Sequence, residues 1–162
     1  MNTIGNITTE ELISKYSDTV FRVAYARTQN VEDAKDITQD VFLKFIKANT
    51  KFNDEEHVKA WLLKVAVNTG NTFVTSAWAR HRAELNEAAD ETGFMEEKSE
   101  VFYAVKDLPE KYRVIVHLFY YEEMSMKEIC SILKLSETAV KSRLHRARTM
   151  LKEKLKEADY EF

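Results

Sequence analysis

Residues Ser125–Arg148 have the sequence SMKEICSILKLSETAVKSRLHRAR, and the rest of the chain is organised around them. It predicts two short helices joined by a tight turn. Ile129, Ile132 and Leu133 give the first helix an apolar side, and Ser136 is a good N-cap hydroxyl for the second helix. This arrangement is typical of a helix-turn-helix motif.

The second helix of this motif has two contrasting sides. Val140, Leu144, Ala147 and Leu151 recur at steps of three and four residues and predict a buried stripe. The remaining faces carry polar and basic side chains that can donate hydrogen bonds to base edges and phosphates: Thr138, Lys141, Ser142, His145 and Arg146. The second helix is therefore a candidate recognition helix. The alternative is an ordinary helical hairpin with a solvated basic face.

The composition favours a helical protein. Three glycines and one proline among 162 residues leave little material for hairpin turns, so we expect an all-α fold. No long uncharged apolar run or signal-peptide pattern is present, which predicts a cytoplasmic protein without membrane insertion. The single Cys130 excludes an internal disulfide, and the four histidines lack partners at metal-site spacing. We expect neither a metal nor a cofactor.

Charge is distributed unevenly along the chain. The total is −3, but residues 141–156 hold seven basic residues and one acidic residue, a local charge of +6. Residues 84–100 hold seven acidic residues and one basic residue, a local charge of −6, and few large apolar side chains. We interpret 84–100 as an acidic linker between two small helical domains, 1–83 and 101–162.

The first domain reads as three helices with recognisable starts. Thr8 with Glu11 forms a capping box, and Asn30 begins a second helix. A third helix is expected to start at Asn53, with a candidate break at Gly70. In the second domain, Pro109 is expected to start an apolar helix, PEKYRVIVHLFYYEE, where its missing N–H is harmless, and this helix should cover the helix-turn-helix.

Two segments resemble the extracytoplasmic-function group of the sigma-70 family of bacterial RNA polymerase sigma factors. DAKDITQDVFLKFI followed by AWLLKVAVNT is similar to the core-binding helix and promoter-melting region of that family. LPEKYRVIVHLFYYEEMSMKEICSILKLSETAVKSRLHRARTMLKEKL is similar to its promoter-reading helix-turn-helix. The resemblance covers most of residues 10–155 in the order of the family, and it implies a sigma factor that directs transcription initiation.

The resemblance also implies binding partners. The first is core RNA polymerase, and its expected contacts lie on one acidic and apolar helix face: Asp36, Gln39, Asp40, Phe42 and Leu43. The second is promoter DNA. An anti-sigma factor is a frequent third partner in this group.

Two promoter elements have implied contacts. The minus-ten element is expected to be captured by residues of the third helix and of the segment after it: Lys64, Asn68, Asn71, Arg80 and Arg82. The minus-thirty-five element is expected to be read by the recognition helix through Thr138, Lys141, Ser142, Arg143, His145 and Arg146. Because residues near a recognition-helix start enter the groove deepest, we expect Thr138, Lys141 and Ser142 to read bases. Arg146 and Arg148 are then phosphate anchors.

The minus-ten region departs from the pattern of the family. Thr72 and Thr75 stand where many members have an acidic residue and an arginine, and the usual basic cluster is reduced to Arg80, His81 and Arg82. Phe73 and Trp78 are candidates either for stacking on unpaired bases or for the core.

Four other classes of protein compete with this interpretation. A helix-turn-helix repressor or activator leaves the DAKDITQDVF helix unexplained, and a response-regulator output module requires a receiver pattern that the first domain lacks. A sigma-like interaction protein that does not support initiation remains an alternative. An enzyme is disfavoured because no phosphate loop, nucleophile elbow or metal cluster is present in the sequence.

Overall fold

The computed structural model describes residues 4–75 and 99–156, with no side chains described for 72–75. The chain divides into two compact units, Met1–Asp90 and Glu91–Phe162, and each is considered by itself. The described secondary structure is helical, as the all-α prediction required, apart from an isolated bridge between Ile4 and Ile7. The domain boundaries predicted at 83/84 and 100/101 stay a prediction, and most of the predicted linker lies among residues 76–98, outside the described part.

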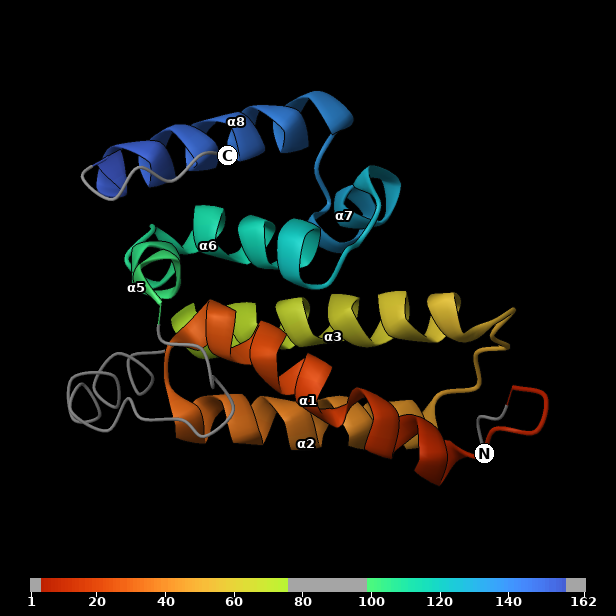
Figure 1. The fold of residues 1–162 in the computed structure, drawn as a ribbon. Helices are drawn as coiled ribbons and strands as arrows, with labels where there is room; N and C mark the ends of the chain where they lie inside the picture. The colour runs from red at the N-terminus through yellow and green to blue at the C-terminus, as the bar shows by residue number, and fades with distance from the viewer. Residues whose placement is uncertain (1–3, 76–98, 157–162) are drawn as a thin grey trace. The chain divides into compact units, whose positions relative to one another are not determined.

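The N-terminal unit packs three helices against one another: α1 (Thr9–Thr28), α2 (Val31–Lys47) and α3 (Glu55–Thr75) (Figure 1). Two predicted starts are confirmed, because the Thr8 hydroxyl accepts from the Glu11 N–H at 3.1 Å and the Asn30 side-chain Oδ1 accepts from the Asp33 N–H at 2.9 Å. The start predicted for the third helix, at Asn53, is one residue too early. Asp54, not Asn53, accepts from the His57 N–H at 2.8 Å.

The interior of this unit is made of apolar side chains that project from all three helices. Leu12, Ile37, Phe45 and Leu63 are fully buried. Phe45 also contacts the ring of Trp61, with 5.8 Å between ring centroids. Aromatic pairs of this kind add to the area that they bury, so α2 and α3 are held firmly together.

Gly70 does not break α3, contrary to the prediction. The helix continues to Thr75, and the stem of Arg27 from α1 packs where a Gly70 side chain would be. A Cβ added at Gly70 would lie 2.7 Å from the Cγ of Arg27. The glycine therefore serves close helix packing rather than helix termination.

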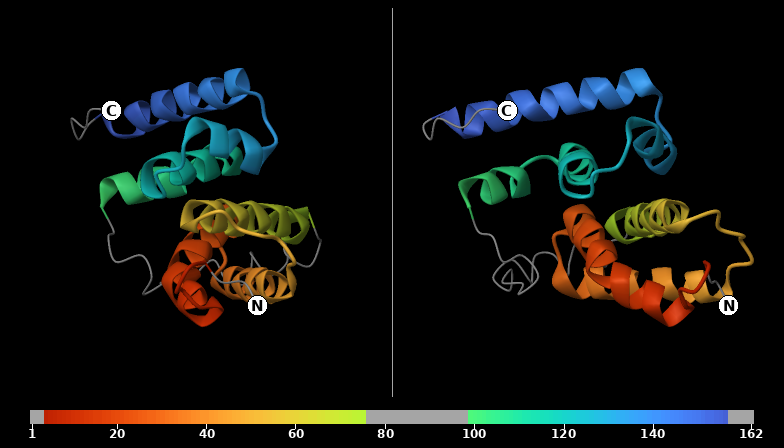
Figure 2. Two further views of the ribbon diagram at one scale, coloured as in Figure 1. Left: turned by 90° about the vertical axis from the view of Figure 1, so that its right-hand side faces the viewer. Right: turned by 45° about the vertical axis from the view of Figure 1, so that its right-hand side comes forward.

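The C-terminal unit begins with α5 (Glu100–Lys106) and α6 (Glu110–Val116). These are followed by the π-helix η1 (His117–Tyr121), by α7 (Met126–Leu133) and by α8 (Glu137–Lys154). Within this unit, α8 lies along α6, with α5 and α7 toward its two ends (Figures 1 and 2). The core between them includes Val105, Tyr112, Ala147 and Leu151. Pro109 is the N-cap residue of α6, so this helix starts at the proline as predicted.

The apolar helix predicted after Pro109 is not uniform. Its last part, His117–Tyr121, has the wider π-helical turn, a form that recurs at functional sites. His117 Nε2 lies 2.9 Å from Glu122 Oε2, and both side chains are buried. The His117 ring also stacks on Tyr121, at 5.2 Å between centroids. Periodicity alone does not distinguish such a turn from an α-helical one.

Within residues 4–75 and 99–156, no helix combines the length and the apolar character needed to cross a membrane. The same part of the chain holds no group of three or more metal-ligating side chains.

Candidate polymerase and nucleic-acid interfaces

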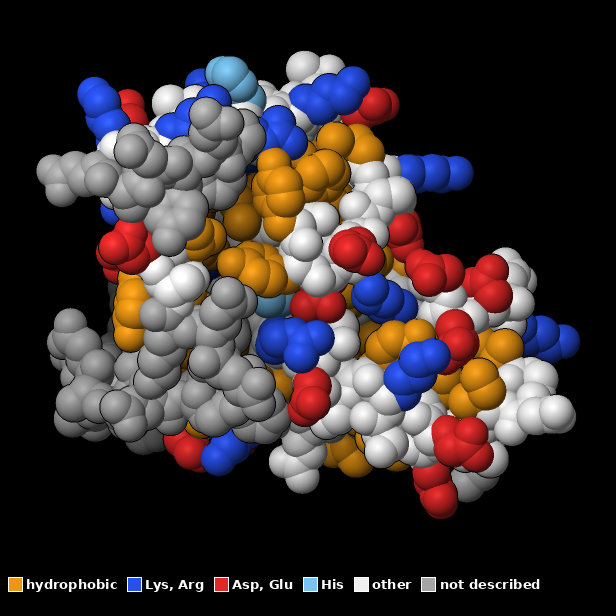
Figure 3. Space-filling view, in the orientation of Figure 1, with side chains coloured by type: hydrophobic (Ala, Val, Ile, Leu, Met, Phe, Trp, Pro, Cys, Tyr) orange, Lys and Arg blue, Asp and Glu red, His pale blue; other side chains and the backbone are white. Residues whose placement is uncertain are grey.

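The face of α8 predicted to be buried is buried. Val140, Leu144, Ala147 and Leu151 have at most 1% of their surface exposed. The five polar residues expected on the other faces are all exposed: Thr138, Lys141, Ser142, His145 and Arg146. Arg143, the sixth residue expected to contact DNA, is half-buried. Lys and Arg side chains gather over α8 in the space-filling view (Figure 3).

The turn before α8 is fixed by local hydrogen bonds. Ser125 and Glu128 form a reciprocal capping box at the start of α7, and Lys134 ends that helix in the left-handed conformation with φ 56°. Ser136 then caps α8 by accepting from the Ala139 N–H at 3.1 Å, as predicted. Because both ends of the turn are held in this way, the polar face of α8 is presented by a rigid support.

Arg146 interacts with Tyr112 on α6. This interaction is the main cause that lowers the pKa of the Tyr112 phenol, and it opposes the effect of burial. Lys111 contributes to the same lowering through its charge, with its ammonium 5.1 Å from the ring centroid. Two cations and a polarised phenol therefore meet at this point, a combination suited to an anionic oxygen.

Lys141 is paired only loosely. Its ammonium lies 3.2 Å from Glu137 Oε1, one helical turn earlier, and the two side chains are 64% and 65% exposed. Exposed pairs of this kind contribute about 0–1 kcal/mol, so an incoming base or phosphate can replace the carboxylate. Lys141 is consequently available to a ligand.

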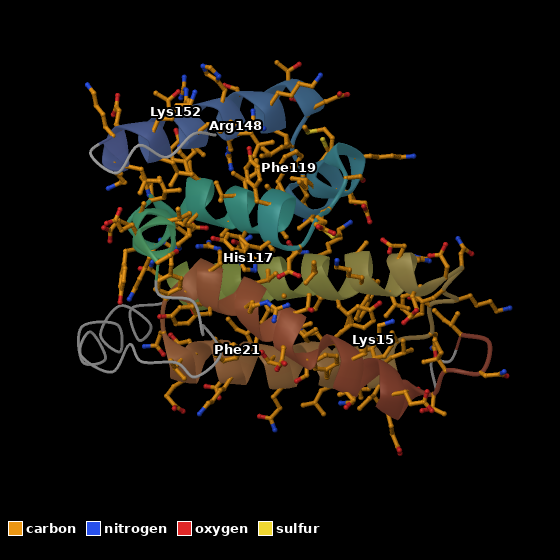
Figure 4. The ribbon with its side chains drawn as sticks, viewed as in Figure 1. Lys15, Phe21, His117, Phe119, Arg148 and Lys152 are labelled. Carbon is orange, nitrogen blue, oxygen red and sulfur yellow. The ribbon has the colours of Figure 1, made fainter. Side chains whose placement is uncertain are left out.

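Arg148 is not a free cation. Its guanidinium points from α8 toward the aromatic residues of η1, beside Phe119 (Figure 4). Arg148 Nε donates to the Tyr120 hydroxyl at 2.5 Å. The sequence pattern of α8 alone did not reveal this contact within the unit, and the role of Arg148 as a phosphate anchor stays a prediction.

The outer face of α2 keeps most of the residues predicted to bind polymerase. Asp36, Gln39 and Leu43 are exposed, and Asp40 is partly exposed. Phe42 is a correction, because only 7% of its surface is exposed. At about 100° per residue it falls beside Val41 and Phe45 on the buried side of the helix.

Ile46 belongs to this outer face and was missed by the sequence analysis. It is 48% exposed, as is Leu43. Its position three residues after Leu43 could have identified it, because residues at that spacing share a helix face. We call Asp36, Gln39, Leu43 and Ile46 the α2 stripe.

The candidate minus-ten residues are only partly described. Lys64 and Asn68 are half-buried on α3, whereas Asn71 is exposed and accepts a hydrogen bond from Arg27 Nε at 2.8 Å. Arg80 and Arg82 lie outside the described residues, as do Trp78 and the side chain of Phe73. The structure thus brings Lys64, Asn68 and Asn71 to the outer faces of one helix.

Comparison with known proteins gives matches over both units. Residues 12–82 match the family model for sigma-70 region 2, and residues 100–151 match the model for sigma-70, region 4. RNA polymerase sigma factor SigZ of Bacillus subtilis is 31% identical over 125 residues, covering 74% of this chain and 71% of that protein. The ECF RNA polymerase sigma factor SigM of the same organism is 29% identical over 159 residues, which cover 90% of this chain and 94% of that protein.

Solved structures with the same fold include the sigma factor RpoE of Bartonella quintana in complex with the anti-sigma factor NepR. That structure has a TM-score of 0.66 at 19% identity, covering 91% of this chain and 96% of that chain. The structure of CnrH in complex with the cytosolic domain of CnrY has a TM-score of 0.64 at 24% identity. The match covers 94% of this chain and 89% of that chain.

Proposed function

The chain belongs to the sigma-70 family, in its extracytoplasmic-function group, and from this premise we propose which residues bind core polymerase and the two promoter elements. A sigma factor directs RNA polymerase to promoters, and the polymerase itself makes the phosphodiester bonds. We therefore propose no catalytic residue in this chain, and we propose that it acts in the cytoplasm, where core polymerase and promoter DNA are found.

The minus-thirty-five element is assigned to the exposed face of α8. Thr138, Lys141 and Ser142 lie nearest the N-terminal end of the recognition helix, the part that enters the major groove deepest. Their exposure opposite the buried stripe supports base reading. Arg146, together with Lys111 and Tyr112 on α6, is assigned to a backbone phosphate because these groups concentrate positive charge and hydrogen-bond donors.

Core polymerase is assigned to the α2 stripe. Leu43 and Ile46 provide apolar area that is half exposed, and Asp36 and Gln39 lie on the same side. Asp40 borders the stripe and adds a second carboxylate. An apolar centre with acidic neighbours suits a partner helix with basic and apolar residues, since interface centres gain from desolvation and rim charges guide association.

The minus-ten element is assigned to α3. Asn68 and Asn71 offer amides, and Lys64 offers a cation, along the outer faces of this helix. Arg80 and Arg82 are retained as proposed backbone contacts by analogy with the family.

Regulation by an anti-sigma factor is also proposed. RpoE of Bartonella quintana has the same fold and was solved in complex with such a partner. A protein of this class would keep the chain from core polymerase by covering one of its binding surfaces.

One observation supports these assignments above all. The same chain has both an exposed α2 stripe in its N-terminal unit and an exposed recognition-helix face in its C-terminal unit. The test is direct titration of labelled chain with purified core polymerase in the absence of DNA. We expect saturable 1:1 binding that an unlabelled chain displaces. Binding to duplex DNA without any affinity for core would instead identify an independent DNA-binding regulator.

A further inference from the structure

Lys44 lies where two proposed surfaces meet in the N-terminal unit. Its ammonium nitrogen is 3.1 Å from Asp40 Oδ2, at the edge of the α2 stripe. The same nitrogen donates to Thr69 Oγ1 on α3 at 3.3 Å. Thr69 directly follows Asn68, one of the proposed minus-ten residues. One side chain thus contacts both the polymerase-binding helix and the DNA-binding helix.

The two partners of Lys44 have different effects on it. Thr69 is neutral and 7% exposed, so its hydroxyl fixes the position of the ammonium without cancelling its charge. Asp40 cancels the charge. The Lys44 and Asp40 side chains are 53% and 45% exposed, and such pairs exchange partners readily because water and ions compete with them.

The charge of Lys44 is important for DNA binding at the edge of α3, because α3 itself carries few basic residues. Lys59 and Lys64 are the Lys or Arg residues between Glu55 and Thr75. Single-stranded DNA is held largely by positive charge that follows its backbone, together with stacking of its bases. A cation supplied from α2 therefore adds substantially to a weakly charged surface.

We propose that Lys44 binds the DNA backbone beside the minus-ten site, and that Asp40 neutralises it until core polymerase binds Asp40. This inference rests on the proposed function of α2 and α3. When a cation of core pairs with Asp40, Lys44 loses its counter-charge while Thr69 still holds it at the edge of α3. Binding of core and binding of the promoter strand then strengthen each other, because each favours the same broken Asp40–Lys44 pair.

The experiment measures binding of the full chain to a fluorescent oligothymidylate without polymerase, over a range of salt concentrations. Asp40→Asn removes the counter-charge with little change in shape. We expect affinity at low salt to rise several-fold, and the salt dependence to steepen by about 0.7 in the log–log slope, the value for one extra phosphate contact on a single strand.

Two comparisons identify the cause. Glu32→Gln is the matched control, because it removes a carboxylate from the same helix, where Glu32 lies 3.7 Å from Lys35. It should raise affinity far less than Asp40→Asn does. Lys44→Ala should change little in the original chain, but it should abolish the gain in the Asp40→Asn background.

Equal gains from Asp40→Asn and Glu32→Gln would overturn the proposal, because they would reflect total charge alone. A gain that survives Lys44→Ala would also overturn it. Thermal unfolding of each variant establishes that the fold is retained. Since core polymerase is absent from this experiment, its outcome is independent of whether the chain binds core or supports initiation.

Discussion

Arg148 on α8 donates a hydrogen bond from Nε to the hydroxyl of Tyr120 in η1, at 2.5 Å. The guanidinium also lies over the rings of Phe119 and Tyr120, 5.8 and 5.7 Å from their centroids. One cation therefore ties the recognition helix to the π-helical turn beneath it. We therefore expect Arg148 to stabilise the position of α8.

Replacing Arg148 should reduce stability rather than alter DNA electrostatics. Arg148→Ala loses a hydrogen bond from a charged donor and its aromatic contacts, so we expect a loss of about 1–3 kcal/mol in the free energy of unfolding. Denaturant unfolding measures this loss. Tyr120→Phe, which keeps the ring, should cost less. The assignment fails if Arg148→Ala leaves stability unchanged and flattens the salt dependence of DNA binding by about one charge.

Lys141 should determine a base preference. Loss of a base-edge contact by Lys141→Ala is expected to cost about 1–3 kcal/mol at one position of the minus-thirty-five element and to relax preference there. A randomised minus-thirty-five library, scored with holoenzyme, measures the change. Arg146→Ala serves as the contrast, because loss of a phosphate contact should weaken all sequences alike. The reverse result would mean that the helix is turned differently in the groove.

Substitutions in the α2 stripe should weaken binding to core polymerase, whereas substitution of the buried Phe42 should reduce stability. Leu43→Ala and Ile46→Ala remove half-exposed side chains, so we expect weaker binding to core with little loss of stability. Phe42→Ala removes a buried ring and should cost about 3–5 kcal/mol of stability. Core titration and denaturant unfolding, carried out on the same variants, separate the two effects. Undiminished core binding by the Leu43→Ala/Ile46→Ala double variant would place the docking surface elsewhere.

The effect of a Gly70 substitution on the free energy of unfolding should depend on the side chain at position 27. Alanine normally stabilises a helix interior by about 1 kcal/mol relative to glycine, but here the new Cβ would lie 2.7 Å from Arg27 Cγ. We expect Gly70→Ala to destabilise the original chain and to stabilise an Arg27→Ala chain. A double-mutant cycle of unfolding free energies tests this change of sign. Equal effects in the two backgrounds would rule out the steric explanation.

Local side-chain chemistry made part of the fold predictable. The caps at Asn30 and Ser136 follow from a side chain that satisfies free N–H groups of its own helix. The buried stripe of α8 follows from helical spacing. For the same reason, the exposed polar face of the recognition helix was identified correctly from the sequence.

Tertiary contacts decided the features that the sequence analysis missed. Phe42 turns inward because the interior of the unit extends past the narrow stripe at Ile37, Val41 and Phe45. Arg148 is held by Tyr120 of η1, which lies 28 residues away along the chain. Gly70 faces a side chain of another helix. None of these contacts leaves a periodic signal in its own segment.

If this chain gives RNA polymerase a promoter specificity that core lacks, in vitro transcription will reveal it. Core polymerase of the same bacterium is assayed with and without the chain on a library randomised at the minus-ten and minus-thirty-five positions. We expect transcripts that require the chain and that arise from templates sharing two sequence elements at a fixed spacing. The same set of transcripts with and without the chain would show that the chain confers no promoter specificity.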